Sequence, residues 1–310
     1  MKQSPYHIKH WPVWFAILLL RLFSLLPVRW RYATAKGLGL VAHRFLHRRR
    51  HVAEVNIDLC FPELTPSERQ DLVKENFIAT AWGVIDITLA FWAKDAYFAE
   101  HSEVHGLELL HQAQQQGQGV LLLGIHVTSL EASGRTLGLR SADMDVTYKQ
   151  ADNLAFDHYL RNRRQQTFKH VIEKYDMRTT LRNLKEGRIV WLASDQDFGR
   201  KGAVFAPFFH QPAATLDNLG RITKITGAKV LFYNHYRIIK NGAPYFVGEV
   251  LDPFTDGFSD DALANATLYN QVLADAIRRH PEQYLWLQKR FRTRPDANAP
   301  RLYTSKKRSR

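Results

Sequence analysis

Short apolar runs alternate with amphipathic segments over most of the 310-residue chain. Residues 119–125 (GVLLLGI) and 188–194 (RIVWLAS) each contain a run of consecutive apolar residues, which is typical of strands in a sheet covered on both faces. Residues 229–236 and 245–251 are predicted to be further strands. Helices are predicted over 65–93, 154–168, 178–186, 214–226 and 260–279. This alternation favours an α/β fold with a mostly parallel sheet flanked by helices.

The amino-terminal segment is far more apolar than the other predicted helices. Residues 11–28 are WPVWFAILLLRLFSLLPV, with the charge of Arg21 inside the run. A span needs about 20 mostly apolar residues, so this segment suits either a short span or a helix in the membrane interface. A core-facing helix is the alternative, and a signal peptide fits poorly because no small-residue cleavage site follows. We expect residues 1–30 to be a membrane anchor, 31–300 one globular domain and 301–310 a basic tail.

A basic surplus characterises the whole chain and indicates its partners. It has 43 Lys and Arg against 30 Asp and Glu, a formal net charge of +13, which suits nucleic acid or an anionic membrane. Basic residues, including Arg48-Arg49-Arg50, follow the apolar segment, an order that favours anionic lipid and a cytoplasmic orientation over nucleic acid. The single cysteine, Cys60, excludes an internal disulfide and fits a reducing compartment.

Polar clusters follow two buried strands, at the sheet edge where sites gather in open α/β folds. His126 follows the strand 119–125, and Glu131 comes five positions later. With His126 in the turn, the Glu131 carboxylate can hold one ring nitrogen and leave the other as a general base. The alternative is structural, because Thr128-Ser129-Leu130-Glu131 matches a capping box in which Glu131 bonds the backbone of Thr128. The second cluster is Asp195-Gln196-Asp197.

Further motifs accompany the His–Glu pair and cover most of the chain. They lie in residues 148–153 (YKQADN), 184–187 (LKEG), 191–199 (WLASDQDFG), 205–209 (FAPFF) and 281–295 (PEQYLWLQKRFRTRP). Together with GIHVTSLE, which contains an H-x-x-x-x-[DE] motif, they resemble the late acyltransferases of lipid A biosynthesis, a branch of the glycerolipid-type acyltransferases. The whole set is far more specific than the His–Glu pair alone.

The resemblance implies an inner-membrane enzyme with its catalytic domain on the cytoplasmic face. Such an enzyme moves a fatty acyl chain from acyl carrier protein to a hydroxyacyl chain of a Kdo-bearing lipid A precursor, with His126 as general base oriented by Glu131. Arg163 or Arg164 is the candidate for stabilising the oxyanion, by analogy and charge. A solvated basic helix face is the alternative for either arginine. Lys149 is grouped with the substrate-binding residues.

Asp195 and Asp197 admit three interpretations. They orient basic residues of the site, bind sugar hydroxyls of the acceptor, or shape the turn that ends at Gly199. Two loop carboxylates also suit a divalent metal ion, but the proposed chemistry needs none and no His/Cys set completes a metal site. We therefore predict neither a metal nor another cofactor.

A basic segment near the carboxyl terminus carries candidate phosphate ligands. Lys289, Arg290, Arg292 and Arg294 lie between aromatic residues in WLQKRFRTRP. Guanidinium groups pair bidentately with phosphate, and lipid A precursors carry phosphates, so these side chains are predicted to bind the headgroup. A general attraction to anionic membrane is the alternative, and it is the preferred interpretation for residues 306–310.

Two functions from other classes compete with acyl transfer. A membrane-associated, metal-dependent phosphodiesterase or hydrolase would place His126, Asp195 and Asp197 around a metal ion, and chelators would inhibit it. A non-catalytic lipid-binding protein would keep its cellular phenotype when His126 is replaced.

Overall fold

The computed structural model describes residues 4–141 and 143–304, so most of the predicted tail, 305–310, lies outside the described residues. The helices are α1 (Trp11–Phe23), α2 (Val28–Phe45), α3 (His47–Cys60), α4 (Pro66–Trp92), α5 (Asp95–Glu100), α6 (Leu107–Gln115), α7 (Leu130–Gly138), α8 (Leu154–Arg164), α9 (Met177–Lys185), α10 (Leu219–Thr226) and α11 (Ala262–Arg279), with 3-10 turns η1 (Ile8–His10) and η2 (Pro281–Gln283). The strands are β1 (Ser102–His105), β2 (Val120–Gly124), β3 (Met144–Tyr148), β4 (His170–Glu173), β5 (Ile189–Ala193), β6 (Ala203–Phe208), β7 (Gln211–Leu216), β8 (Lys229–Lys240) and β9 (Ala243–Leu251).

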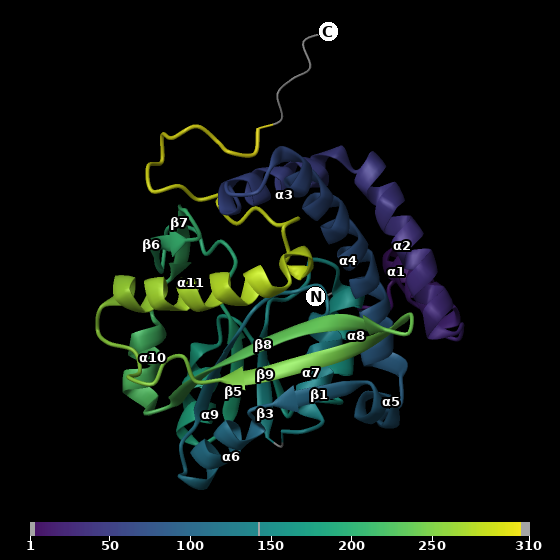
Figure 1. Ribbon diagram of the computed structural model, residues 1–310. Coiled ribbons are helices and arrows are strands. Elements are labelled where there is room, and N and C mark those ends of the chain that lie inside the picture. The colour runs from purple at the N-terminus through teal and green to yellow at the C-terminus, as the bar shows by residue number, and fades with distance from the viewer. Residues whose placement is uncertain (1–3, 142, 305–310) are drawn as a thin grey trace.

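A twisted sheet forms the centre of the molecule (Figure 1). Within the described residues it has seven strands in the order β1-β9-β8-β2-β5-β3-β4. Strands β8, β2, β5, β3 and β4 run parallel to one another, whereas β9 is antiparallel to β8 and carries β1 parallel to itself. Strands β6 and β7 form a separate antiparallel pair. The prediction of a mostly parallel sheet flanked by helices is confirmed.

Apolar side chains cover both faces of the sheet at its centre because β2 and β5 are apolar at every position. In β2, Leu121 and Leu123 belong to the core shared with α3, α4 and α11. Val120 and Leu122 point the other way, into the core shared with α6 and α7. In Figure 1, α3 and α11 lie above the sheet and α6 lies below it. This two-sided burial fixes β2, and therefore the turn that follows it.

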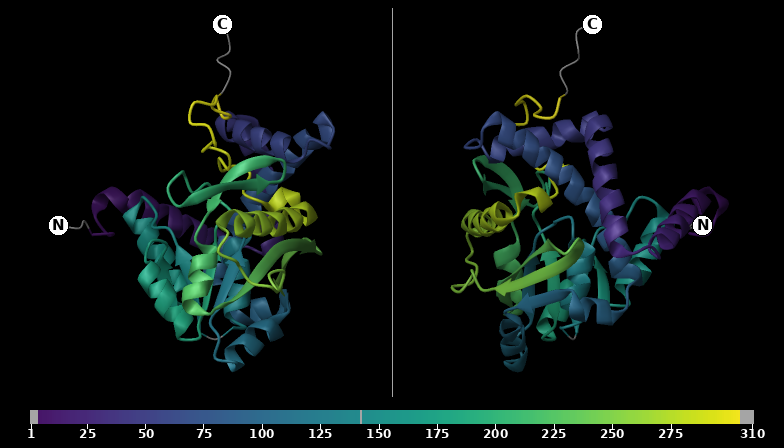
Figure 2. Two further views of the ribbon diagram at one scale, coloured as in Figure 1. Left: turned by 90° about the vertical axis from the view of Figure 1, so that its left-hand side faces the viewer. Right: turned by 45° about the vertical axis from the view of Figure 1, so that its right-hand side comes forward.

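The apolar segment 11–28 is divided between two helices. Helix α1 ends at Phe23, α2 begins at Val28, and the turn between them contains Pro27. Helix α1 contacts α8, whereas α2 packs along α4, and Figure 2 shows α1 projecting from the side of the molecule. Among the helices that the structure describes, none combines the length and apolarity required to cross a membrane. The anchor over residues 1–30 stays a prediction.

One predicted helix is partly wrong. Residues 214–226 were expected to be helical, but Gln211–Leu216 is strand β7 and α10 begins only at Leu219. Strand β7 pairs with β6, and Ala213, Ala214 and Thr215 are buried there. The small residues fit this crowded position, and the pairing overrides their helix propensity.

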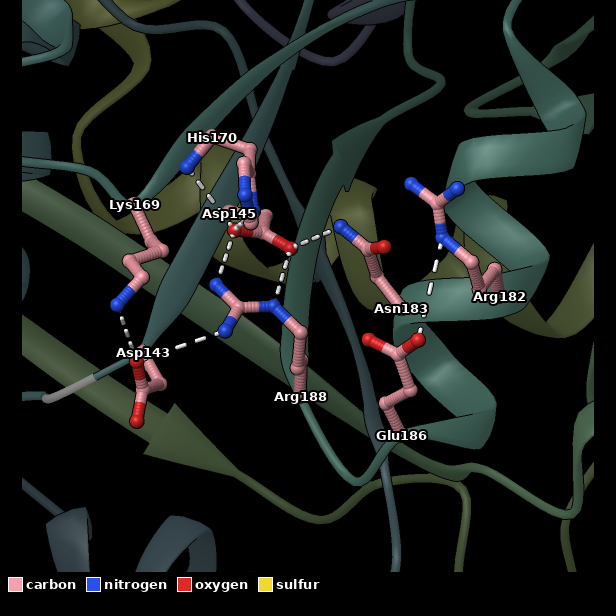
Figure 3. A network of polar contacts seen from close by, with 8 residues as sticks. All are labelled: Asp143, Asp145, Lys169, His170, Arg182, Asn183, Glu186 and Arg188. Atoms are coloured by element: carbon pink, nitrogen blue, oxygen red, sulfur yellow. Dashed lines mark hydrogen bonds and ion pairs between the residues drawn. The ribbon is translucent and has the colours of Figure 1, made fainter.

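A polar network joins the amino ends of β3, β4 and β5 (Figure 3). His126 follows β2, which runs parallel to these strands, so it lies at the opposite end of the sheet. The buried Asp145 carboxylate accepts hydrogen bonds from Arg188 Nε (2.8 Å), Asn183 (2.6 Å) and the backbone N–H of His170 (3.1 Å). Burial alone would raise the pKa of Asp145, but these donors, Arg188 first, hold it below its usual range. The network therefore fixes three neighbouring strands in register.

Candidate functional site

His126 lies at the carboxyl end of β2 and is held by a carboxylate from the neighbouring strand. Its ring nitrogen Nδ1 is 2.5 Å from Asp195 Oδ1, and its backbone N–H donates to Asp195 Oδ2 at 3.0 Å. Asp195 follows β5 and is fully buried, while the imidazole is 22% exposed. Burial alone would raise the pKa of Asp195, but His126 and its two donors hold it below its usual range. The ionised carboxylate can only accept, so Nδ1 carries the proton and Nε2 is free to act as a base.

The two turns are held in place by tyrosines from distant segments. Tyr269 of α11 donates to the Gly124 carbonyl (2.7 Å) and accepts from the backbone N–H of Ser194 (3.2 Å), which ties the end of β2 to the end of β5. Tyr284 donates to the Asp195 carbonyl at 3.0 Å and forms a backbone bridge with Val127. The positions of His126 and Asp195 are thus set by the core and not by the loops alone.

Gly124 is required by the close approach of an aromatic ring. A Cβ atom at this position would lie 2.2 Å from the indole nitrogen of Trp191, so any other residue would force this buried ring to shift. The indole also stands edge-on to the His126 imidazole, with ring centroids 6.0 Å apart. Trp191 therefore forms one wall of the site.

Glu131 does not contact the His126 imidazole, so the prediction that it orients this ring is corrected: Asp195 does so. The Glu131 carboxylate pairs with Arg164, which donates from Nε to Oε2 at 3.2 Å and from a second nitrogen to Oε1. The capping box is not formed either, because the backbone N–H of Thr128 donates to the Gln283 carbonyl and α7 begins at Leu130. The Nδ1 atom of His126 is instead bonded to Asp195, which follows β5, the strand adjacent to β2.

Arg164 and Arg163 have different surroundings although they are neighbours in α8. Burial alone would lower the pKa of Arg164, but the Glu131 carboxylate raises it overall, so the guanidinium is charged. Arg163 donates to the Tyr159 hydroxyl at 3.1 Å and to the Phe91 carbonyl at 3.4 Å. It lies in the groove between α1 and α8. Of the two candidates, only Arg164 pairs with the predicted site residue Glu131.

A narrow, mostly apolar cavity begins beside the Glu131–Arg164 pair. It contains about 380 Å³ of empty space, its open mouth included, between α7 and the sheet. His235 of β8 also lines it, and burial lowers the pKa of this imidazole to about 4, so the ring is neutral. The apolar part of the wall comes from Leu130, Leu137, Met144, Val146, Phe168 and Trp191. Because Trp191 also touches His126, the cavity adjoins the candidate base.

Asp197 shapes a turn, which was one of its three predicted roles. Its carboxylate accepts from the backbone N–H of Gly199 (2.9 Å) and from the backbone N–H (2.6 Å) and hydroxyl (2.8 Å) of Thr293. Asp195 instead fulfils the first predicted role, that of orienting a basic residue. Over residues 4–141 and 143–304, no group of three or more His, Cys, Asp and Glu side chains is placed to hold a metal ion.

Arg290 is not available for the predicted phosphate contact. It is only 2% exposed and donates to the Ala214 carbonyl (2.9 Å) and the Thr215 hydroxyl (3.1 Å) of β7. Its role is to attach the carboxyl-terminal segment to the β6–β7 pair. Lys289 and Arg292 are exposed, and Arg294 is half-buried, so their headgroup contacts stay predictions. Lys149 is exposed directly after β3, at the same sheet edge as His126.

Several residues of the site carried no individual signal in the sequence. Trp191, Gln283 and Tyr284 lie inside segments that were recognised as motifs, so their importance was visible but their contacts were not. Tyr269 and His235 lie on an ordinary amphipathic helix and an ordinary strand. The sheet order places His235 of β8 beside β2, and the packing of α11 against the sheet brings Tyr269 to the ends of β2 and β5.

Comparison with known proteins supplies the family. The model of a family described as bacterial lipid A biosynthesis acyltransferase matches residues 1–293. The chain belongs to this family. The resemblance predicted from the motifs is confirmed, and the protein is an acyltransferase.

Relatives of this acyltransferase match it along nearly its whole length. The chain is 33% identical over 298 residues to the lipid A biosynthesis palmitoleoyltransferase of Escherichia coli (strain K12), covering 93% of this chain and 94% of the relative. It is also 33% identical over 291 residues to the lipid A biosynthesis lauroyltransferase of the same organism, covering 94% of each. The chain is 23% identical over 289 residues to the lipid A biosynthesis myristoyltransferase of that organism, covering 93% of this chain and 89% of the relative.

Proposed function

We propose that this acyltransferase moves a fatty acyl chain from acyl carrier protein to a hydroxyacyl chain of a Kdo-bearing lipid A precursor. The observation that carries the proposal is the His126–Asp195 pair beside an apolar cavity, in a chain of this family. The names of the relatives support a lipid A precursor as the acceptor. The hydroxyl to be acylated would lie at His126, with acyl chain accommodated along the cavity wall.

His126 acts as the general base in this proposal. Nε2 takes the proton of the acceptor hydroxyl as its oxygen attacks the thioester carbonyl, and Asp195 stabilises the resulting imidazolium. The tetrahedral intermediate then breaks its C–S bond, and the departing thiolate takes the proton from Nε2. The products are an ester and the free thiol of the carrier, so no protein nucleophile is needed.

Arg164 is the proposed donor for the oxyanion. Glu131 engages one edge of its guanidinium, which fixes the plane of the group and leaves other N–H donors for the substrate. A positioned donor of this kind stabilises the charge that develops on the thioester oxygen. Glu131 is thus a positioning residue for Arg164.

The proposed location is the cytoplasmic face of the inner membrane. Residues 1–30 serve as the anchor, and the net charge of +13 supports both anionic lipid and an acidic carrier protein as partners. Lys149, Lys289, Arg292 and Arg294 are the proposed contacts to the phosphorylated headgroup.

A transfer assay with the purified protein tests the proposal. An acyl-carrier-protein thioester and a lipid A precursor should yield the acylated lipid, and the same acyl group on coenzyme A should react more slowly. A chelator should leave the rate unchanged. Strong preference for the coenzyme A thioester would refute the carrier assignment, and loss of activity with a chelator would support the metal-dependent hydrolase.

A further inference from the structure

Helix α2 presents an apolar surface that no described part of the chain covers. Its inner face packs on α4, where Tyr32, Ala35 and Gly39 are buried. A Cβ atom at Gly39 would lie 2.8 Å from the Ile78 backbone, so the two helices are in the closest contact there. The inner face is therefore fixed against the body of the protein, and the outer face is turned away from it.

The outer face of α2 carries a stripe of large apolar side chains. Trp30 is 68% exposed, Leu38 61%, Val41 54% and Phe45 67%. At about 100° per residue, these four positions and Thr34 fall within an arc of about 80°, over a length of roughly 22 Å. We call Trp30, Leu38, Val41 and Phe45 the α2 stripe. A contiguous exposed patch of this kind marks an interaction surface.

Positive charge borders the α2 stripe on the side away from the core. Helical spacing places Arg29, Lys36 and Arg44 there, and all three are exposed. Helix α2 contains no acidic residue, and none of these three cations forms an ion pair with any residue in the described part of the chain. The surface thus combines an apolar stripe with a cationic border, which is the pattern of a helix lying in the interface of an anionic membrane.

We propose that the outer face of α2 lies on an anionic lipid bilayer, with the α2 stripe among the acyl chains and its cationic border at the phosphates. Helix α1 lies at the same side of the molecule (Figure 1) and also exposes large apolar side chains, namely Trp11, Phe15, Leu18 and Leu22. A second copy of the chain fits less well, because stripe-to-stripe contact would bring the cationic borders of two strongly basic proteins together.

This surface overlaps the proposed anchor over residues 1–30, which contains Arg29, Trp30 and α1, and extends it along α2 to Phe45. It does not rest on the proposed acyl transfer, because lipid contact by α2 requires no catalysis. A bilayer on α2 would nevertheless affect the orientation of the site. Tyr32 of the inner face donates to Asp86, Asp86 pairs with Arg237, and Arg237 reaches the Thr128 hydroxyl at 3.4 Å. The membrane-facing helix is therefore joined through buried polar groups to the turn that carries His126.

Vesicle sedimentation with the full chain tests the proposal. The triple variant Leu38→Ser, Val41→Ser, Phe45→Ser should partition at least about tenfold less onto phosphatidylglycerol-containing vesicles than the parental protein. The control variant Ile225→Ser, Leu263→Ser, Leu268→Ser removes exposed apolar side chains from α10 and α11 and should bind like the parent. Unchanged thermal melting of both variants verifies that each is folded.

A fluorescent label reports the depth of α2 directly. Thr34→Cys can be labelled alone because the native Cys60 is buried. Anionic vesicles should shift the emission to the blue, and quenchers in the acyl region should reduce it, whereas a label at Asp275→Cys on α11 should not respond. The proposal is overturned if the Thr34→Cys label stays in water while the triple variant binds like the parent. It is equally overturned if the α2 stripe mediates a dimer whose label no lipid quencher reaches.

Discussion

Asp195 contacts His126 at two points, and this double contact distinguishes the pair from a surface ion pair. The carboxylate accepts from the ring at 2.5 Å and from the backbone at 3.0 Å, and it is fully buried. Ring orientation, tautomer and backbone position are therefore set by one group. As the proposed general base, a histidine held in this way would lose little freedom when the acceptor binds.

Replacing either member of the pair should abolish most of the activity. His126→Ala removes the base, which typically contributes about 100- to 10,000-fold, and Asp195→Asn removes the charge that stabilises the imidazolium. The double variant should be hardly slower than His126→Ala, because the two residues act as one unit. Single-turnover rates measure this effect, with thermal melting to verify folding. Full activity in Asp195→Asn would show that the carboxylate has no catalytic role.

The adjacent arginines Arg163 and Arg164 of α8 provide a matched pair of variants that tests which side chain stabilises the oxyanion. Arg164→Ala should lower kcat by about 100- to 1,000-fold, since it removes the donor beside the cavity. Arg163→Ala should leave kcat within about twofold, because that side chain contacts Tyr159 and the Phe91 carbonyl instead. Steady-state kinetics of the two variants decide the assignment. Equal losses in both would mean that the arginines act through helix stability or surface charge.

At the scale of elements, the sequence predicted both halves of the site but not their pairing. The buried strands ending at Gly124 and Ala193 were visible, as were the polar clusters that follow them. Glu131 was chosen as the partner of His126 because it is close in sequence. Asp195 is 69 residues away and reaches the ring only because β5 is the neighbour of β2. Strand order depends on the packing of the whole sheet, which no local pattern encodes.

The same limit explains the error at Arg290. An arginine between aromatic residues can bind phosphate if it lies on an exposed loop, and the sequence pattern alone predicted that role for Arg290. Its burial depends on β7, the second half of which was expected to be helical. Where a residue's partner comes from an unpredicted element, its environment cannot be inferred from its neighbours in the chain.

The Asp145 network gives a prediction for stability and its pH dependence. Asp145→Asn should lower the free energy of unfolding at pH 7 by roughly 3 kcal/mol, because it leaves the Arg188 guanidinium without its carboxylate. Since the pKa of Asp145 is held below its ordinary value of about 3.9, its stabilisation is complete above about pH 4 and is lost as the pH falls further. Urea titrations at several pH values should show the two proteins converging in acid.

The control for the Asp145 variant is an exposed ion pair close to the same network. Arg182 and Glu186 lie 3.9 Å apart and are both exposed (Figure 3). Arg182→Met should therefore change the unfolding free energy by less than about 1 kcal/mol. A constant difference between the parental protein and Asp145→Asn from pH 7 to acid would contradict the role given to the carboxylate.

At the scale of the whole molecule, the net charge of +13 predicts a salt-sensitive encounter with the proposed donor, the acidic acyl carrier protein. Raising ionic strength should lower kcat/KM for the acyl-carrier-protein thioester, because screening weakens electrostatic steering, while kcat at saturation changes less. The corresponding coenzyme A thioester, which has no carrier surface to dock, should respond less. If moderate salt left kcat/KM for the carrier unchanged, charge would not guide the encounter.

Mass spectrometry of lipid A from cells with and without this protein tests the central claim most directly. Cells that lack the protein should accumulate lipid A with one fewer fatty acyl chain, and the mass lost identifies the chain. The parental gene should restore the full mass, whereas a gene encoding His126→Ala or Asp195→Asn should not, although both variants are made in folded form. Unchanged lipid A masses in cells lacking the protein, or full restoration by His126→Ala, would contradict the account.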